Sequence, residues 1–221
     1  MNTWEIRPVA IVEADDFMDR YDRSGLNFLF YWKAKYPNFK ITLFTVPDRT
    51  SDYLLSKLHS EEFAHFAMHG WNHESNFECY GWDYDKTMAY LDRLERCHWY
   101  DKIFKAPGGT ITPDNNGYPA GENDPIVKDK QAVYKALRDR DYIIFDRHYN
   151  KFVRPEGCKI VCVDCNPKIV HMHTWDTPGP ANERNGFIRV EEDHGVPWDD
   201  KTEFNFITEA WSKNLFDPCK N

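Results

Sequence analysis

Short runs of apolar and β-branched residues alternate along the chain with longer amphipathic stretches, and this alternation limits the fold more than any other feature. Runs of this length are typical of buried strands, and the stretch after each run predicts a helix that crosses over to the next strand. Strands connected by helices lie parallel, so the pattern predicts an α/β protein with a barrel or an open sheet. The seven predicted strands are residues 9–13, 40–45, 63–68, 102–105, 142–145, 159–163 and 168–171.

The helical period is clearest in residues 85–96, where Met88, Leu91 and Leu94 recur every three residues. It is also clear in residues 126–138, where Val133 and Leu137 are four apart. Two further helices are expected at 26–35 and 51–58. A chain of 221 residues can bury roughly 70% of its unfolded surface, so we expect one domain over residues 1–221.

Two segments rich in Gly, Pro and Asn interrupt this pattern, at residues 108–123 and 176–197. Such composition predicts loops. Loops of this length are uncommon inside a domain and are often functional. We therefore expect a substrate-binding rim at these two segments.

The charge of the chain excludes the commonest kind of nucleic-acid-binding protein. Lys and Arg number 28 against 36 Asp and Glu, a formal net charge of -8, whereas affinity for phosphates requires a basic surface. The sequence has no run of about 18 apolar residues, which excludes a membrane-spanning helix. Trp4, Glu5 and Arg7 stand where a signal peptide would be apolar, so we expect a cytoplasmic protein whose six cysteines are reduced.

Two adjacent carboxylates, Asp15 and Asp16, follow the first apolar run. Adjacent side chains at a strand end diverge, so one can bind a metal ion while the other faces a reactive water. The alternative is that the pair caps the following helix and interacts with its positive N-terminus.

The third predicted strand leads into His69 and His73. If this segment is helical, the two imidazoles lie on one face and can reach one cation. Isolated pairs with this spacing are common, but the Asp pair at another strand end strengthens the hypothesis. Two histidines and one carboxylate leave coordination positions open for water, as a hydrolytic metal site requires.

Charged and titratable side chains also end the fourth and seventh strands. Lys105 precedes a Pro-Gly-Gly turn and can hold a carboxylate in position, although a lysine at a strand exit is often only solvated. His171 and His173 share one face of the seventh strand by period-two alternation. Either histidine is a candidate general acid, and a structural role is the alternative for each.

Taken in order, these segments resemble the polysaccharide deacetylase family, which comprises carbohydrate esterase family four and its relatives. The resemblance covers about residues 9 to 176. The matching segments are Ala14-Asp15-Asp16-Phe17, His69 to His73, Phe104-Lys105-Ala106-Pro107 with Gly109, a faint Phe145-Asp146, and either Ile169 with His171 or His171 with His173.

The resemblance implies a distorted (β/α)7 barrel with its site at the carboxyl ends of the strands. It implies that Asp16, His69 and His73 bind a divalent metal, with zinc the expected ion, and that Asp15 is the general base. His173, or else His171, would protonate the departing amine of an N-acetylated sugar. The chain departs from the family pattern at Phe17, where Gly is usual, and at Lys105, which replaces the Arg that orients the base.

Three alternatives remain open from the sequence. One is a relative that hydrolyses another C–N bond, such as a cyclic amide. Another is a catalytically silent sugar-binding barrel, with Trp71, Trp82 and Trp175 as stacking platforms. The third is a structural zinc site, for which the four candidate ligands are Cys158, Cys162, Cys165 and His171.

Overall fold

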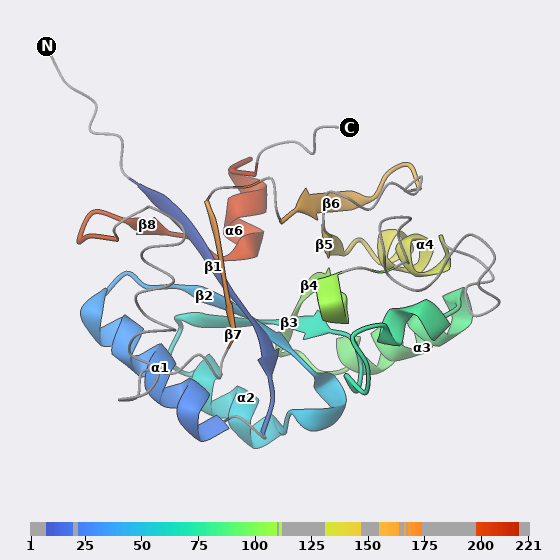
Figure 1. Cartoon of the computed structure of the whole chain (residues 1–221), viewed down its shortest axis with the longest axis horizontal. Coiled ribbons are helices and arrows are strands. Elements are labelled where there is room, and N and C mark those ends of the chain that lie inside the picture. Colours follow the sequence, from blue (N-terminus) through green and yellow to red (C-terminus); the bar gives the residue numbers. More distant parts are fainter. Residues whose placement is uncertain are drawn as a thin grey trace, which may run out of the picture.

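A curled sheet of parallel strands forms the centre of the computed structural model (Figure 1). The structure describes residues 8–19, 22–109, 111, 131–146, 155–163, 166, 168–173 and 198–216. Within them the strand order is β6-β5-β4-β3-β2-β1-β7, and β8 pairs with β1 outside this path. The strands are β1 Val9–Phe17, β2 Ile41–Thr45, β3 Ala64–His69, β4 Tyr100–Lys105, β5 Ile143–Asp146, β6 Lys159–Cys162, β7 Ile169–His173 and β8 Glu203–Phe204.

Helices connect and cover these strands as the alternation of the sequence predicts. The α-helices are α1 Asp22–Lys35, α2 Asp52–His59, α3 Tyr84–Glu95, α4 Ala132–Asp139 and α6 Ile207–Ser212. Three short 3-10 turns are η2 Pro47–Arg49, η3 Glu78–Gly81 and η4 Pro107–Gly109. All seven predicted strands and the four predicted helices are confirmed, although residues 126–130 of the fourth helix lie outside the described residues.

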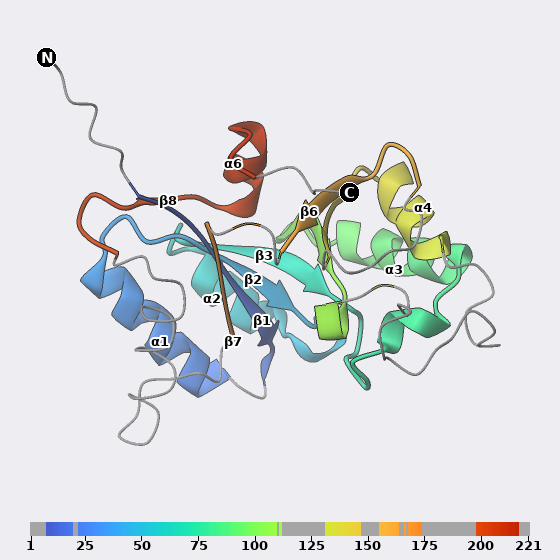
Figure 2. The same cartoon turned by 45° about the horizontal axis from the view of Figure 1, so that its top comes forward.

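Two opposite faces of the sheet can be distinguished by what packs against them. Figures 1 and 2 place α1 and α2 on one face of the sheet and α6 on the other. We call the α6 side the inner face. On the opposite, outer face, Val12 and Ala14 of β1 belong to an apolar cluster with residues of α1 and α2. On the inner face, Ile11 belongs to a cluster with Ile207 of α6.

The inner face carries an apolar cluster that lies before the carboxyl ends of the strands. Ile11, Phe44, Ala67, Ile103 and Phe145 from five strands meet Ile207 and Ala210 of α6 there. Because side chains alternate between faces, the positions two residues further along these strands also face inward, nearer the carboxyl ends. Glu13, His69 and Lys105 of the site occupy three of these positions.

The strand that carries the two aspartates is longer than predicted. We expected it to end at Glu13, but β1 runs to Phe17, with a register shift against β2 between Ala14 and Phe17. Acidic residues usually mark a strand exit, yet Glu13, Asp15 and Asp16 are all buried. Two elements were not predicted, β8 and α6, because two and six residues are too short to show a period.

The two long loops predicted to form the substrate rim cannot be compared with the structure, because residues 112–130 and 174–197 lie outside the described part. Among the described helices, none combines the length and the apolar character needed to cross a membrane.

Candidate active site

Strand register brings the predicted site residues together at the carboxyl ends of the strands. Asp15 of β1 pairs with His173 of β7, and His69 of β3 pairs with Lys105 of β4. Each residue lies on the inner face of its strand. Four strands therefore deliver polar side chains into one region, the end at which barrel enzymes carry out their chemistry.

Asp16, His69 and His73 form a group whose ligand atoms lie within 4.8 Å of one another. His73 Nε2 is 2.9 Å and His69 Nε2 is 3.5 Å from the same oxygen, Asp16 Oδ1. His69 Nδ1 lies 3.0 Å from the carbonyl oxygen of Lys105, and because a carbonyl only accepts, this nitrogen carries the hydrogen. The lone pair of His69 Nε2 therefore faces Asp16. Two imidazoles and one carboxylate, with one imidazole fixed in this way, fit a divalent cation with open positions.

The charges around this group favour an ionised carboxylate and a neutral His69. Burial alone raises the pKa of Asp16, but the hydrogen bond with His73 and the nearby His69 outweigh it, so the pKa is lowered. Burial lowers the pKa of His69, whose side chain is almost inaccessible. The hydrogen bond with Asp16 raises the pKa of His73. An ionised Asp and a neutral His are the forms that bind metal ions.

His69 and His73 are brought together by a tight turn, and not by the helix that would also place residues at this spacing on one face. His69 ends β3, and positive φ angles follow at Gly70 (64°) and His73 (48°). A Cβ on Gly70 would lie 2.4 Å from Glu78 Oε2, so no larger residue fits this position without a shift.

The Glu78 carboxylate holds this turn. It accepts hydrogen bonds from the backbone N–H groups of Trp71, Asn72 and His73 at 2.9 to 3.1 Å. Successive N–H groups that converge on one anion form a concave backbone arrangement that needs a negative charge to remain closed. Glu78 therefore fixes the position of His73 through the backbone of the turn.

Replacing Glu78 by Gln should weaken metal binding about 10- to 100-fold, the range for residues that orient metal ligands. The amide keeps one acceptor oxygen but presents an NH2 group to backbone donors. The measurement is calorimetric titration of the metal-free protein with Zn²⁺. Glu74→Gln is the matched control, because Glu74 is an exposed carboxylate of the same turn. Equal affinity in the two variants would contradict this role for Glu78.

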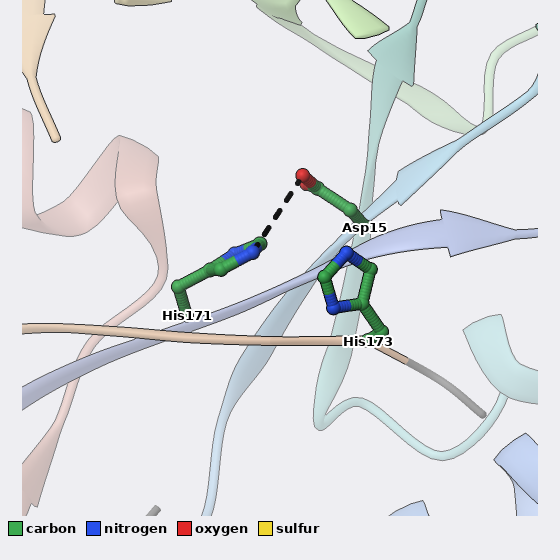
Figure 3. Close-up of side chains that lie close together, drawn as sticks. All are labelled: Asp15, His171 and His173. Atoms are coloured by element: carbon green, nitrogen blue, oxygen red, sulfur yellow. Dashed lines mark ion pairs between the residues drawn. The ribbon is translucent and has the colours of Figure 1, made fainter. Parts of the chain in front are cut away.

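A second group adjoins the first and contains a buried ammonium. Lys105 Nζ lies 2.9 Å from Asp15 Oδ1 and 2.8 Å from Glu13 Oε1. His171 Nδ1 lies 2.9 Å from the same Glu13 oxygen, and its Nε2 is 4.0 Å from Asp15 Oδ2 (Figure 3). His173 Nε2 lies 3.9 Å from Asp16 Oδ2. The structure thus brings all seven predicted site residues together.

Glu13 is a member of this group that the sequence analysis missed. It is fully buried, and its Cα pairs with that of His171 across β1 and β7. One signal was available, because Glu13 stands two residues before Asp15 and must share its face.

The pKa shifts of Asp15, Lys105 and His171 favour the charged forms of these three side chains. Burial raises the pKa of Asp15, but Lys105, His69 and His171 together outweigh it, so the pKa is lowered. Burial lowers the pKa of Lys105, but Asp15 and Glu13 outweigh it, so the pKa is raised. Burial lowers the pKa of His171, but Glu13 and Asp15 together outweigh it, so the pKa is also raised. Asp15 is therefore an ionised acceptor beside a histidine that readily holds a proton.

Two residues proposed as sugar platforms lie in the core, so that part of the interpretation is wrong. Trp71 and Trp82 are 7% and 5% exposed. Trp71 stacks on Tyr90 at a centroid distance of 4.6 Å and has Arg93 over its ring. Trp175 lies outside the described residues.

The proposed cysteine zinc site is not supported by the described residues. None of their cysteines belongs to a group of side chains close enough to share an ion. Cys158 Sγ lies 3.7 Å from the Tyr134 carbonyl, and His171 pairs with Glu13. Cys165 lies outside the described part.

Asp146 belongs to the faint Phe145-Asp146 segment of the family resemblance. Its carboxylate accepts a hydrogen bond from the Tyr134 hydroxyl at 2.5 Å.

Solved structures with a similar fold include two carbohydrate esterase proteins. The Xyl-CE4 domain of a multidomain xylanase, from the hindgut metagenome of Trinervitermes trinervoides, has a TM-score of 0.54 and 12% identity, covering 97% of this chain and 95% of the other. A family 4 acetyl xylan esterase from Clostridium thermocellum, in complex with a cobalt ion, has a TM-score of 0.51 and 14% identity, covering 95% and 93%. The fold is that of the family 4 esterases.

This likeness confirms the expected (β/α)7-type barrel and, at the level of the fold, the resemblance to polysaccharide deacetylases. No protein-family profile matches the chain. No curated protein sequence matches it either. At 12% and 14% identity, the family 4 likeness establishes how the strands and helices are arranged, and the chemistry must be argued from the side chains.

Proposed function

We propose that the chain is a metal-dependent hydrolase that removes acetyl groups from N-acetylated sugars. The observation that carries this proposal is the cation group Asp16, His69 and His73 directly beside Asp15, which Lys105 holds. Two solved structures of similar fold are a xylanase CE4 domain and an acetyl xylan esterase, which supports an acetylated carbohydrate as the substrate class.

The geometry supports a distinct chemical role for each residue of the site. A divalent cation bound by Asp16, His69 and His73 would lower the pKa of a bound water toward about 7 and polarise the acetyl carbonyl. Asp15 accepts a proton from the attacking water, and Lys105 keeps its carboxylate ionised and in place. One of the two β7 histidines donates a proton to the departing nitrogen. The water oxygen bonds to the carbonyl carbon, the C–N bond breaks, and acetate and a free amine leave.

The charge balance favours one cation per chain. Asp15, His171 and His173 also lie close enough to share an ion. However, Lys105 Nζ already lies 2.9 Å from Asp15 and 3.3 Å from His171 Nδ1, so a second cation would meet an ammonium at close range. The charges of Glu13, Asp15 and Asp16 are offset by Lys105 together with a single divalent ion. We therefore assign the cation to the Asp16 group.

Acetate release tests the proposal. Protein loaded with Zn²⁺ or Co²⁺ should release acetate from N-acetylated chito-oligosaccharides, and chelation should abolish the release until metal is restored. The same assay is run on O-acetylated xylo-oligosaccharides and on cyclic amides. No acetate from any acetylated sugar would overturn the proposal, and opening of a cyclic amide alone would favour a relative acting on another C–N bond.

Asp15→Asn separates a hydrolase from a silent sugar-binding protein. The amide cannot accept the proton of the attacking water, so turnover should fall by about 10²-fold or more while the variant still binds metal. The measurements are acetate release and metal content of the same sample. Sugar binding by a parent protein with no turnover would favour the silent alternative.

A further inference from the structure

Glu13 is a buried carboxylate at which two groups of the site meet. Its side chain is inaccessible, and one of its oxygens, Oε1, lies 2.8 Å from Lys105 Nζ and 2.9 Å from His171 Nδ1. The three residues come from β1, β4 and β7. A carboxylate buried in this way without a countercharge would be strongly unfavourable, and Lys105 supplies that charge.

The contact with Glu13 determines which nitrogen of His171 carries the hydrogen. His171 Nδ1 lies 2.9 Å from Glu13 Oε1, which accepts, and 3.3 Å from Lys105 Nζ, which donates. Because the carboxylate is the nearer partner, the geometry favours a hydrogen on Nδ1 that is donated to Glu13 Oε1. His171 Nε2 is then the nitrogen that points toward Asp15, with Oδ2 4.0 Å away (Figure 3). The His171 side chain is 34% exposed, so a substrate can reach it. A proton on Nε2 is therefore available to a leaving group bound next to Asp15.

His173 occupies a different place. Its Nε2 lies 3.9 Å from Asp16 Oδ2, so it faces the carboxylate of the cation group. Its Cα pairs with that of Asp15, two residues further along the strands than the pairing of His171 with Glu13. Both β7 histidines have a ring nitrogen within 4.8 Å of an Asp15 oxygen, so what distinguishes them is Glu13. The histidine in contact with the buried Glu13–Lys105 pair is His171.

We propose that Glu13 is a positioning residue that orients His171 as the proton donor to the departing amine. This inference rests on the proposed amide hydrolysis and deepens it, because it assigns the donor role to one histidine. Glu13 contacts His171 and Lys105, and its buried side chain places it behind them, out of reach of solvent.

The nature of the leaving group gives a test that a merely structural role would not pass. An amine must be protonated as the C–N bond breaks, whereas 4-nitrophenolate leaves without a proton. Glu13→Gln should lower kcat for an N-acetylated chito-oligosaccharide about 10- to 100-fold with KM nearly unchanged. The same variant should lower the hydrolysis of 4-nitrophenyl acetate less than about threefold. Equal losses on the two substrates, or no loss on either, would overturn the inference.

Two further variants keep the test decisive if Glu13→Gln folds poorly. His171→Ala alters a partly exposed side chain, and it should show the same selective loss on the amide. Glu13→Asp keeps the charge and should recover part of the amide activity. Asp101→Asn is the matched control, because Asp101 pairs with His65 at 2.8 Å on the neighbouring strands, away from the cation group. The control should hydrolyse both substrates at the parent rate.

Nitrogen NMR of the histidine side chains gives a readout that needs no turnover. In the parent protein, His171 Nδ1 should show a bound hydrogen, and Glu13→Gln should change that signal while Asp101→Asn changes the His65 signal. If the parent releases no acetate, the proposed function fails, and the NMR result alone decides the pairing. If the parent is active but His171 carries no hydrogen on Nδ1, the inference about Glu13 is wrong.

Discussion

Replacing Asp16 or His69 by Ala should remove the bound cation and lower acetate release on the order of 10³-fold, comparable to losing a main electrostatic stabiliser of the transition state. Asp16 Oδ1 is the oxygen that His69 and His73 both face, so without it the two imidazoles have no anionic partner for the ion. His69 is buried and its tautomer is fixed by the Lys105 carbonyl, so no neighbour can substitute for it. Metal content after dialysis and acetate release are measured on the same samples.

His65→Gln is the control for this pair of variants. His65 lies on the same inner face of β3 as His69, but it stacks on Phe206 at a centroid distance of 3.7 Å and pairs with Asp101. This variant should retain one metal ion per chain and the parent activity. If Asp16→Ala and His69→Ala both keep their metal, the cation group has been assigned wrongly.

The second large effect concerns stability. Lys105→Met should lower the free energy of unfolding by about 3–5 kcal/mol, because it leaves Glu13 and Asp15 buried without their countercharge. For a chain of this size, that loss corresponds to a Tm lower by roughly 10 °C. Thermal unfolding monitored by circular dichroism measures it, in buffer without added metal.

Two companion variants separate charge from packing in this result. Lys105→Arg keeps the positive charge and should lose much less stability than Lys105→Met, although the guanidinium is larger and planar. The double variant Lys105→Met with Glu13→Gln removes the charge of both partners. Its loss of unfolding free energy should therefore be smaller than the sum of the losses in the two single variants. Additive losses in the double variant would mean that the Lys105–Glu13 pair contributes little.

Much of the sheet could be predicted because parallel strands covered on both faces appear as nearly continuous apolar runs. The same logic placed Asp15, Asp16 and His69 near strand ends, and the shared direction of the strands brought those ends together. The end of β1 was predicted too early, because a run of acidic residues ordinarily leaves a sheet. Here the cost of burying those carboxylates is offset by Lys105, which comes from a distant part of the chain.

Other features depend on contacts that one sequence does not reveal. The turn between His69 and His73 is held by Glu78, and only positive φ angles bring the imidazoles together. Glu13 stands in an apolar run with no neighbour in the chain to indicate its partners, since His171 lies 158 residues away. Trp71 illustrates the same difficulty, because an aromatic ring has the same identity whether it lines a cleft or packs under Tyr90.

The pairing of β1 with β7 also has a consequence for the order in which the site is assembled during synthesis. The proposed cation ligands Asp16, His69 and His73 are all present once residue 73 has emerged from the ribosome. The proposed proton donor, His171, belongs to β7, which is synthesised much later and pairs with β1 at one edge of the sheet order. A nascent chain could thus collect its metal ion early, while the ability to break a bond would arise only when β7 completes the sheet.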